Sequence, residues 1–298
     1  MPELQAHAER LTEEFGGAEL ATFRPISFTA LKTYAPQPDE AYGTTLQRVG
    51  RRGMYLVLEF PALTFVVHLM QGGRLKPDEK QSPKPRGGLA RFVFADGRAL
   101  LLTEAGTEKR AGVWAVAGDV ERLEPVVGLG PDAESLDASA LGAILAQHSG
   151  RIHGVLRNQQ ALAGLGRRLA NEICHTAKLS PFANAAKLSP EEVERLAAAI
   201  HTECEASLAY ERSRDDMSSS KERPGAVHHR EGETCPVCGD TVRAVEYRSY
   251  TVNYCATCQT GGKVLADNTT STILKSPRTA APPARPPQLD ARTPPRRT

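Results

Sequence analysis

The chain has 298 residues, of which 40% are hydrophobic, and a formal net charge of +2 at neutral pH. This length suits two domains or one large one, and the apolar content is sufficient for a buried core. No apolar run approaches the length of a transmembrane helix, and Glu3, Glu9 and Glu13 argue against a secretory signal peptide at the start. We therefore expect a soluble, cytoplasmic protein without a membrane partner.

The charge is unevenly distributed along the chain. Residues 1–150 carry 16 basic and 19 acidic side chains, residues 151–275 carry 16 and 15, and residues 276–298 carry five arginines and one aspartate. The net charges of these segments are therefore −3, +1 and +4. A nucleic-acid-binding domain usually has a clearly basic balance, so any contact with DNA must come from local clusters of basic residues.

The first 130 residues predict one short helix followed by many strands. Residues 4–15 have helical spacing and end at Gly16 and Gly17. Asp96-Gly97, between two apolar runs, is typical of a hairpin turn. Because no helix separates the strands, we expect an antiparallel sandwich or barrel. The strand-like runs cover residues 18–28, 44–60, 63–75, 89–106 and 112–118.

Helical patterns dominate after about residue 130. The run 188–210 opens with Ser189, Pro190 and Glu192, which form a capping box with proline at the first helical position. Glycines interrupt the helical pattern within residues 161–168. Backbone N–H groups at the start of the following helix would suit a phosphate, and a plain helix-packing glycine pair is the alternative interpretation.

Four of the six cysteines form two C-x-x-C pairs within "CPVCGDTVRAVEYRSYTVNYCATC". This spacing is typical of a structural zinc site, and the valine, tyrosine and threonine content between the pairs predicts a β-hairpin. Two disulfides or a redox pair are the alternatives, but no secretory signal or βαβ pattern supports them. We expect one Zn²⁺ bound by Cys235, Cys238, Cys255 and Cys258, and buried free thiols at Cys174 and Cys204.

Together these patterns predict an α+β protein with four parts. An N-terminal antiparallel β-sandwich covers residues 1–130, and a helical domain covers residues 131–228. A zinc-ribbon β-hairpin covers residues 229–275. The remaining segment, 276–298, has seven prolines in 23 residues and is expected to be a disordered basic tail.

Several segments, taken in order, resemble a known family. They are "MPEL" at the start, the strand-rich region, "NQQALAGLGRRLANEICHTAKLSPFA", and "CPVCGDTV" followed by "YCATCQTGGK". Together they resemble the formamidopyrimidine-DNA glycosylase and endonuclease VIII family over residues 2 to 275, and "LTEAGTEKRAG" and "TGGKVLAD" are similar to its actinobacterial branch. The resemblance implies a bifunctional DNA glycosylase and abasic-site lyase of base-excision repair. It further implies a helix–two-turns–helix motif, damaged double-stranded DNA as partner, and a monomer associated with the nucleoid.

The resemblance implies that Pro2 and Glu3 are catalytic. Removal of Met1, which precedes a small residue, would leave Pro2 with a secondary amine, and an α-amino group is partly neutral near pH 7. Such an amine can attack the anomeric carbon of a damaged nucleoside, and the adjacent Glu3 is the natural proton carrier. Taken without the resemblance, Pro2-Glu3 is an ordinary soluble start of a chain.

DNA contacts are implied at four further positions. Gln71 and Arg110 match loops of the family that fill the space left by an extruded base, and their alternative interpretation is as solvated loop residues. Arg167 follows the glycine loop and retains the capacity to bind phosphate. Arg248, near the tip of the predicted hairpin, replaces a family arginine only if the hairpin register shifts.

The chain departs from the family pattern at positions of functional weight. Ala6 stands where the family's N-terminal motif has its second glutamate. In the strand-like run 50–60, the family has a catalytic lysine directly after the glycine, and Met54 occupies that position here. The arginine five residues before the third cysteine is replaced by Tyr250. In the glycine-loop motif, the residues that differ are Asn158 and Arg167.

These departures leave three hypotheses. The first is a glycosylase and lyase. The second is a protein that binds abasic or distorted DNA with weak or no glycosylase activity. The third is a zinc-ribbon factor that binds other proteins through its Pro/Arg-rich tail.

Overall fold

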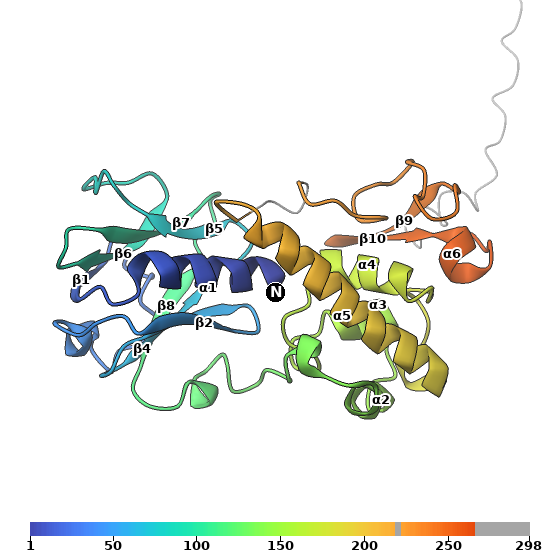
Figure 1. Ribbon diagram of the computed structural model, residues 1–298, viewed down its shortest axis with the longest axis horizontal. Coiled ribbons are helices and arrows are strands. Elements are labelled where there is room, and N and C mark those ends of the chain that lie inside the picture. Colours follow the sequence, from blue (N-terminus) through green and yellow to red (C-terminus); the bar gives the residue numbers. More distant parts are fainter. Residues whose placement is uncertain (218–221, 266–298) are drawn as a thin grey trace, which may run out of the picture.

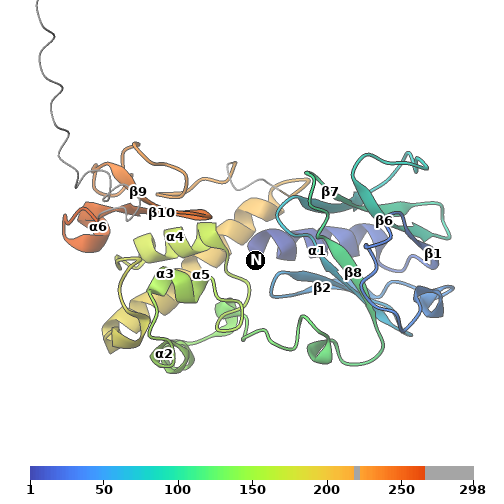
Figure 2. The same cartoon turned by 180° about the vertical axis from the view of Figure 1, so that it is seen from behind.

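The computed structural model describes residues 1–217 and 222–265. Figures 1 and 2 show two halves side by side, a β-sandwich and a helical half, with the zinc-ribbon hairpin lying over the helices. The α+β class and the order of these parts were predicted correctly. The predicted tail 276–298 lies outside the described residues. Within the described residues, no helix combines the length and apolar content needed to cross a membrane.

Helix α1, Pro2–Phe15, begins the chain and starts two residues earlier than predicted. Proline is favoured in the first turn of a helix because its missing N–H needs no partner there. Leu4, Ala8, Leu11 and Phe15 recur every three or four residues and are buried in the core of the sandwich. This apolar stripe fixes α1 against the sheets and so fixes where the chain begins.

Two four-stranded antiparallel sheets form the sandwich, with strand orders β1-β6-β7-β5 and β2-β3-β4-β8. Apolar residues from both sheets fill a shared core, so the predicted antiparallel sandwich is confirmed. The strands are β1 Leu20–Pro25, β2 Arg48–Arg52, β3 Tyr55–Glu59, β4 Thr64–His68, β5 Gly73–Pro77, β6 Gly88–Phe94, β7 Ala99–Glu104 and β8 Gly112–Val116. Short 3₁₀ turns, η1 Pro38–Ala41 and η2 Val120–Arg122, lie in the connections.

The helical half has a separate apolar core built from its own helices. Its elements are η3 Ala133–Ser135, α2 Ala138–Ala146, α3 Ile152–Leu156, α4 Arg167–Thr176, η4 Ala185–Lys187 and α5 Pro190–Arg212. The capping box predicted for α5 is present, because Ser189 and Glu192 each accept the other's backbone N–H. The glycine loop separates α3 from α4, as predicted.

The two halves are joined through helices α1 and α5. Arg212 near the end of α5 pairs with Glu9 of α1 at 2.7 Å, and Arg10 donates to the backbone oxygen of Glu211 at 2.9 Å. Helix α1 therefore contacts both halves. The division of the chain into two domains near residue 130 remains a prediction.

The hairpin consists of β9, Val242–Tyr247, and β10, Tyr250–Cys255, followed by α6, Ala256–Thr260. The two strands pair without a bulge across a two-residue turn. Tyr254 is fully buried and packs edge-on against Phe182, which anchors the hairpin on the helical half.

Candidate functional site

The amino terminus lies where the two halves meet (Figure 1). A Cβ atom placed on Gly164 would lie 3.1 Å from the Met1 nitrogen, and one placed on Gly166 would lie 3.7 Å from Met1 Sδ. Gly164 has a φ of +90°, which favours glycine. The fold therefore brings the first residue into contact with the glycine loop between α3 and α4.

Arg51 of β2 lies beside this terminus, since the same Cβ atom on Gly164 would lie 3.3 Å from its Nη1, and its side chain is 4% exposed. Its Nη1 donates to Asp132 Oδ1 at 2.9 Å and to the oxygen of Gly53 at 3.0 Å, and its Nη2 pairs with Glu134. Burial, and then the charge of Arg51, lower the pKa of the Met1 amine. These surroundings favour a neutral, nucleophilic amine at this point.

Glu3 is held by Arg223, a residue of the segment that follows α5. Arg223 Nη2 lies 3.1 Å from Glu3 Oε1, and its Nη1 lies 3.4 Å from Oε2. The Nε atom of Arg223 is 3.2 Å from Oε1 of Glu211, whose side chain is fully buried. One guanidinium thus bridges two carboxylates from different helices.

The bridge determines the charge state of Glu3. Burial has the largest influence on this carboxyl group and favours its neutral form, but Arg223 and a backbone hydrogen bond outweigh burial. The net effect lowers the pKa of Glu3 below its ordinary value of 4.5. Glu3 is therefore an ionised proton acceptor at neutral pH.

A buried glutamate of α4 shapes the segment that carries Arg223. Glu172 accepts backbone N–H groups of Ala226 at 2.8 Å, Val227 at 3.3 Å and His228 at 2.8 Å. These N–H groups lie outside any helix or strand, so the Glu172 carboxylate accepts the hydrogen bonds that regular secondary structure would otherwise satisfy. Glu172 thus supports Arg223 indirectly, and Arg223 supports Glu3.

Met54 occupies a turn, which corrects its expected place within a strand. Gly53 and Met54 form the two-residue connection between β2 and β3, and Gly53 has a φ of +54°. A Cβ atom on Gly53 would lie 3.3 Å from that of Ala163, so this turn packs against the glycine loop. Met54 is half-buried against the sandwich core and adds no charge beside the terminus.

Gln71 and Arg110 lie in neighbouring loops of the sandwich. His68, the last residue of β4, pairs with Gly112, the first of β8, and Ala105 donates its N–H to the oxygen of Gly72 at 3.1 Å. Gln71 is exposed, and Arg110 is 67% exposed and pairs with Glu108 at 2.9 Å. The fold brings these two loops together, and a role in DNA contact for either residue stays a prediction.

Arg167 and Arg248 both lie near the tip of the hairpin. Arg167 is the first residue of α4 and donates to the oxygen of Ser249 at 3.3 Å. Arg248 is exposed in the two-residue turn before Tyr250, and the regular pairing of β9 with β10 shows no register shift. Each cross-strand pair of the hairpin aligns without an extra residue, and the use of Arg248 in place of the family arginine stays a prediction.

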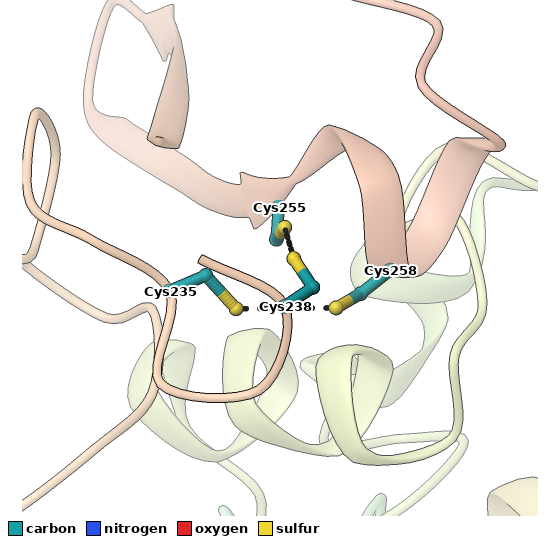
Figure 3. A group of neighbouring side chains, drawn as sticks. All are labelled: Cys235, Cys238, Cys255 and Cys258. Carbon is teal, nitrogen blue, oxygen red and sulfur yellow. Dashed lines mark hydrogen bonds between the residues drawn. The ribbon is translucent and has the colours of Figure 1, made fainter. Parts of the chain in front are cut away.

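The four cysteines of the hairpin form one cluster (Figure 3). Their sulfur atoms all lie within 4.8 Å of one another, with 3.3 Å between Cys238 and Cys255 and 3.9 Å between Cys235 and Cys258. Sulfurs around a tetrahedral Zn²⁺ are about 3.8 Å apart, given Zn–S bonds of about 2.3 Å. All six cysteines are free, so the disulfide alternative is wrong and the cluster can hold a metal ion.

Sequence reasoning missed Arg223. It lies in a polar segment within the predicted helical domain 131–228, and Pro224-Gly225 after it signals no more than a turn. Nothing local distinguishes this arginine from an ordinary solvated one. Its importance depends on contacts across 220 residues of chain.

Comparison with known proteins identifies the family. A model of the formamidopyrimidine-DNA glycosylase N-terminal domain matches residues 1–108. An uncharacterized formamidopyrimidine-DNA glycosylase-like protein of Mycobacterium tuberculosis is 42% identical over 152 residues, which are 49% of this chain and 94% of that protein. The chain belongs to the formamidopyrimidine-DNA glycosylase family. The formamidopyrimidine-DNA glycosylase of Chloroflexus aurantiacus is 26% identical over 271 residues, 87% of this chain and 96% of that protein.

Solved structures show the same fold as this family member. The Lactococcus lactis Fpg in complex with DNA containing an abasic site superposes with a TM-score of 0.77. The match covers 87% of this chain and 98% of that one, at 20% sequence identity. The arrangement of sandwich, helices and hairpin is therefore the fold of the formamidopyrimidine-DNA glycosylases.

Proposed function

We propose that this protein is a bifunctional DNA glycosylase and abasic-site lyase that acts as a monomer in base-excision repair. The observation that carries the proposal is the buried chain terminus, which meets Arg51, the glycine loop and the ionised Glu3 at the junction of the two halves. The relatives named as formamidopyrimidine-DNA glycosylases, and the solved complex with abasic-site DNA, support damaged duplex DNA as the substrate.

Pro2 is the proposed nucleophile once Met1 has been removed. Burial beside Arg51, which lowers the pKa of the Met1 amine, would likewise favour the neutral amine of Pro2. The volume occupied by Met1 lies against Gly164 and Gly166, where the sugar would enter. The glycine at position 164 allows close approach, because a Cβ atom there would crowd the terminus at 3.1 Å, whereas one on Gly166 would make only ordinary contact at 3.7 Å.

The proposed reaction begins when the Pro2 nitrogen bonds to C1′ of the damaged nucleoside. The C1′–N bond to the base breaks, the base leaves with a proton, and opening of the sugar ring gives an iminium. Loss of a proton from C2′ then expels the 3′ phosphate, and a second elimination at C4′ expels the 5′ phosphate. Glu3 starts ionised, so it first accepts a proton and can return it later.

One Zn²⁺ is the proposed occupant of the cysteine cluster. Four thiolates at these separations match its preferred ligands, and such closed sites stabilise a fold instead of performing chemistry. The metal would hold both ends of the hairpin, and so the position of its tip. Gln71, Arg110, Arg167 and Arg248 are the DNA contacts that we retain from the sequence.

A second candidate function is recognition of abasic DNA without efficient base removal. Met54 and Tyr250 favour it, because neither offers the positive charge found in the family at those positions. Arg51 and Arg52, the nearest alternatives to a lysine at position 54, are already paired with Asp132, Glu134 and Glu121. This candidate predicts tight binding without a covalent intermediate.

Borohydride trapping on duplex DNA containing an abasic site distinguishes the two functions, because reduction captures only an iminium. The wild-type protein with its terminus verified by mass spectrometry, and a Pro2→Gly variant that retains an amine, should both form the covalent adduct. A form with an uncleaved N-terminal tag should shift the DNA in a gel and form no adduct. Trapping by the blocked form would show that a lysine, and not Pro2, is the nucleophile, whereas binding without trapping by the wild type would support the second candidate.

A further inference from the structure

Two stacked tyrosines form the tip of the β9–β10 hairpin. Tyr247 and Tyr250 face each other across the two-residue turn, with ring centroids 4.7 Å apart and an interplanar angle of 11°. The guanidinium carbon of Arg157 lies 3.9 Å from the centroid of the Tyr250 ring. Arg151 donates from Nη1 to the Tyr247 hydroxyl at 2.9 Å. Arginines at both ends of α3 are thus fixed to the hairpin through its tyrosines.

Four arginines converge on this tip without a carboxylate partner. Arg151 and Arg157 flank α3, Arg167 begins α4 and contacts Ser249, and Arg248 lies in the turn. Within residues 1–217 and 222–265, none of these four forms an ion pair. The protein as a whole is nearly neutral, but positive charge is concentrated at this tip. The overall composition did not reveal this local cluster.

Arg157 is the least satisfied of these cations. It is half-buried, and its Nε atom is buried without a hydrogen-bond partner among the described residues. Burial has the largest influence on the pKa of Arg157 and lowers it. The Tyr250 hydroxyl raises this pKa, and the like charge of Arg167 lowers it further. A partly desolvated cation beside a second cation gains most from an external anion.

We propose that Arg157, packed on the Tyr250 ring, binds a backbone phosphate of DNA together with Arg167. This inference rests on the proposed function and identifies a phosphate contact at the hairpin tip. Arg157 would supply there the charge that the family places at position 250 and that Tyr250 lacks. A guanidinium offers planar paired donors that match phosphate oxygens.

The tyrosines position the cation and do not stack on bases. The Tyr250 ring already contacts Tyr247, Arg157 and His153, whose ring lies 6.0 Å away at an interplanar angle of 17°. It is therefore not available to an extruded base. A contact made through guanidinium groups to phosphate is independent of sequence, so Arg157 should affect damaged and intact duplex equally.

The test measures duplex binding over a range of salt concentrations, with and without a tetrahydrofuran abasic-site analogue. Arg157→Met should weaken binding to both duplexes by about tenfold or more at moderate salt. It should also make the slope of log K against log salt shallower by about one. The matched control is Arg122→Met, which removes an 88% exposed arginine of η2 in the sandwich half and should change neither quantity.

A double-mutant cycle tests the positioning role of Tyr250. Tyr250→Ala should weaken binding about as much as Arg157→Met, and the double variant should be no weaker than either single one. Tyr250→Phe keeps the ring and should retain most of the affinity. Zinc content and circular dichroism establish that each variant is folded. If Arg157→Met does not fold, Arg157→Lys replaces it and should bind more weakly than the wild type with an unchanged salt slope.

The outcomes separate this inference from the proposed function. If the wild type binds duplex DNA and Arg157→Met binds with the same affinity and salt slope, the inference is wrong and the proposed function stands. If the wild type binds neither duplex, both are wrong. Additive losses in the cycle would show that Tyr250 does not act through Arg157.

Discussion

Replacement of Arg223 tests whether one buried cation controls the charge of Glu3. In Arg223→Met the guanidinium between Glu3 and Glu211 is lost, and a side chain of similar length without charge remains. The side chains of Glu3, Arg223 and Glu211 are 15%, 4% and 0% exposed, so solvent cannot compensate for the loss. We expect two buried carboxylates without their common partner.

The expected loss of stability is large. Removing one partner of a buried ion pair costs about 3–5 kcal/mol, whereas a whole domain is stable by only about 5–15 kcal/mol. Arg223→Met should therefore unfold at a clearly lower urea concentration than the wild type at pH 7. Arg223→Lys keeps the charge but cannot reach both carboxylates with a planar fork, so we expect a smaller loss.

The dependence on pH gives the sharper signature. In the wild type the pKa of Glu3 is lowered, so the stability from its ionisation is complete above pH 4.5 and is lost as pH falls toward the folded-state pKa. In Arg223→Met burial dominates and should raise the pKa of Glu3 above 4.5. Ionised Glu3 then destabilises the fold at pH 7, and acidification toward pH 5 relieves this cost.

Urea unfolding of both proteins between pH 7 and pH 5 measures the effect. The difference in unfolding free energy between the wild type and Arg223→Met should shrink as pH falls. Glu3→Gln in the Arg223→Met background isolates Glu3 from Glu211 and should remove this contribution to the pH dependence. A constant difference over this range would refute the assignment of Arg223 as the partner that keeps Glu3 ionised.

Three further predictions concern Met54, the metal and the tail. Met54→Lys should accelerate removal of an oxidised purine by roughly ten- to hundredfold, and strand cleavage at a ready-made abasic site by less; single-turnover rates on the two substrates decide it, and equal gains would contradict it. Freshly purified protein should contain about one zinc per chain, and its removal by a chelator should abolish duplex binding; metal analysis that finds free thiols and no zinc would exclude the site. Deletion of residues 276–298 should make the salt dependence of DNA binding shallower while leaving single-turnover rates unchanged, since the tail carries five arginines and one aspartate; an unchanged salt slope would assign the tail another role.

Features that depend on neighbours along the chain could be predicted from the sequence. The spacing of Cys235, Cys238, Cys255 and Cys258 indicated one metal cluster because each pair occupies a single tight turn. The capping box at Ser189 and the alternating strands of the sandwich were predicted for the same reason, since local hydrogen bonds and apolar periodicity determine them. The predicted strand run 44–60 is in fact two strands, β2 and β3, joined by a turn at Gly53 and Met54, which only the backbone conformation revealed.

Features that depend on packing were decided by the tertiary structure. Glu3 and Arg223 are 220 positions apart, and Arg157 and Tyr250 belong to different elements, so no local pattern marks either pair. Their free energies come from burial and from the approach of charges, which exist only after α1 has packed against the segment that follows α5, and α3 against the hairpin. The sequence alone determined which reactive and charged side chains the chain carries. Packing determined that Arg223, and not a residue near Pro2, pairs with the Glu3 carboxylate.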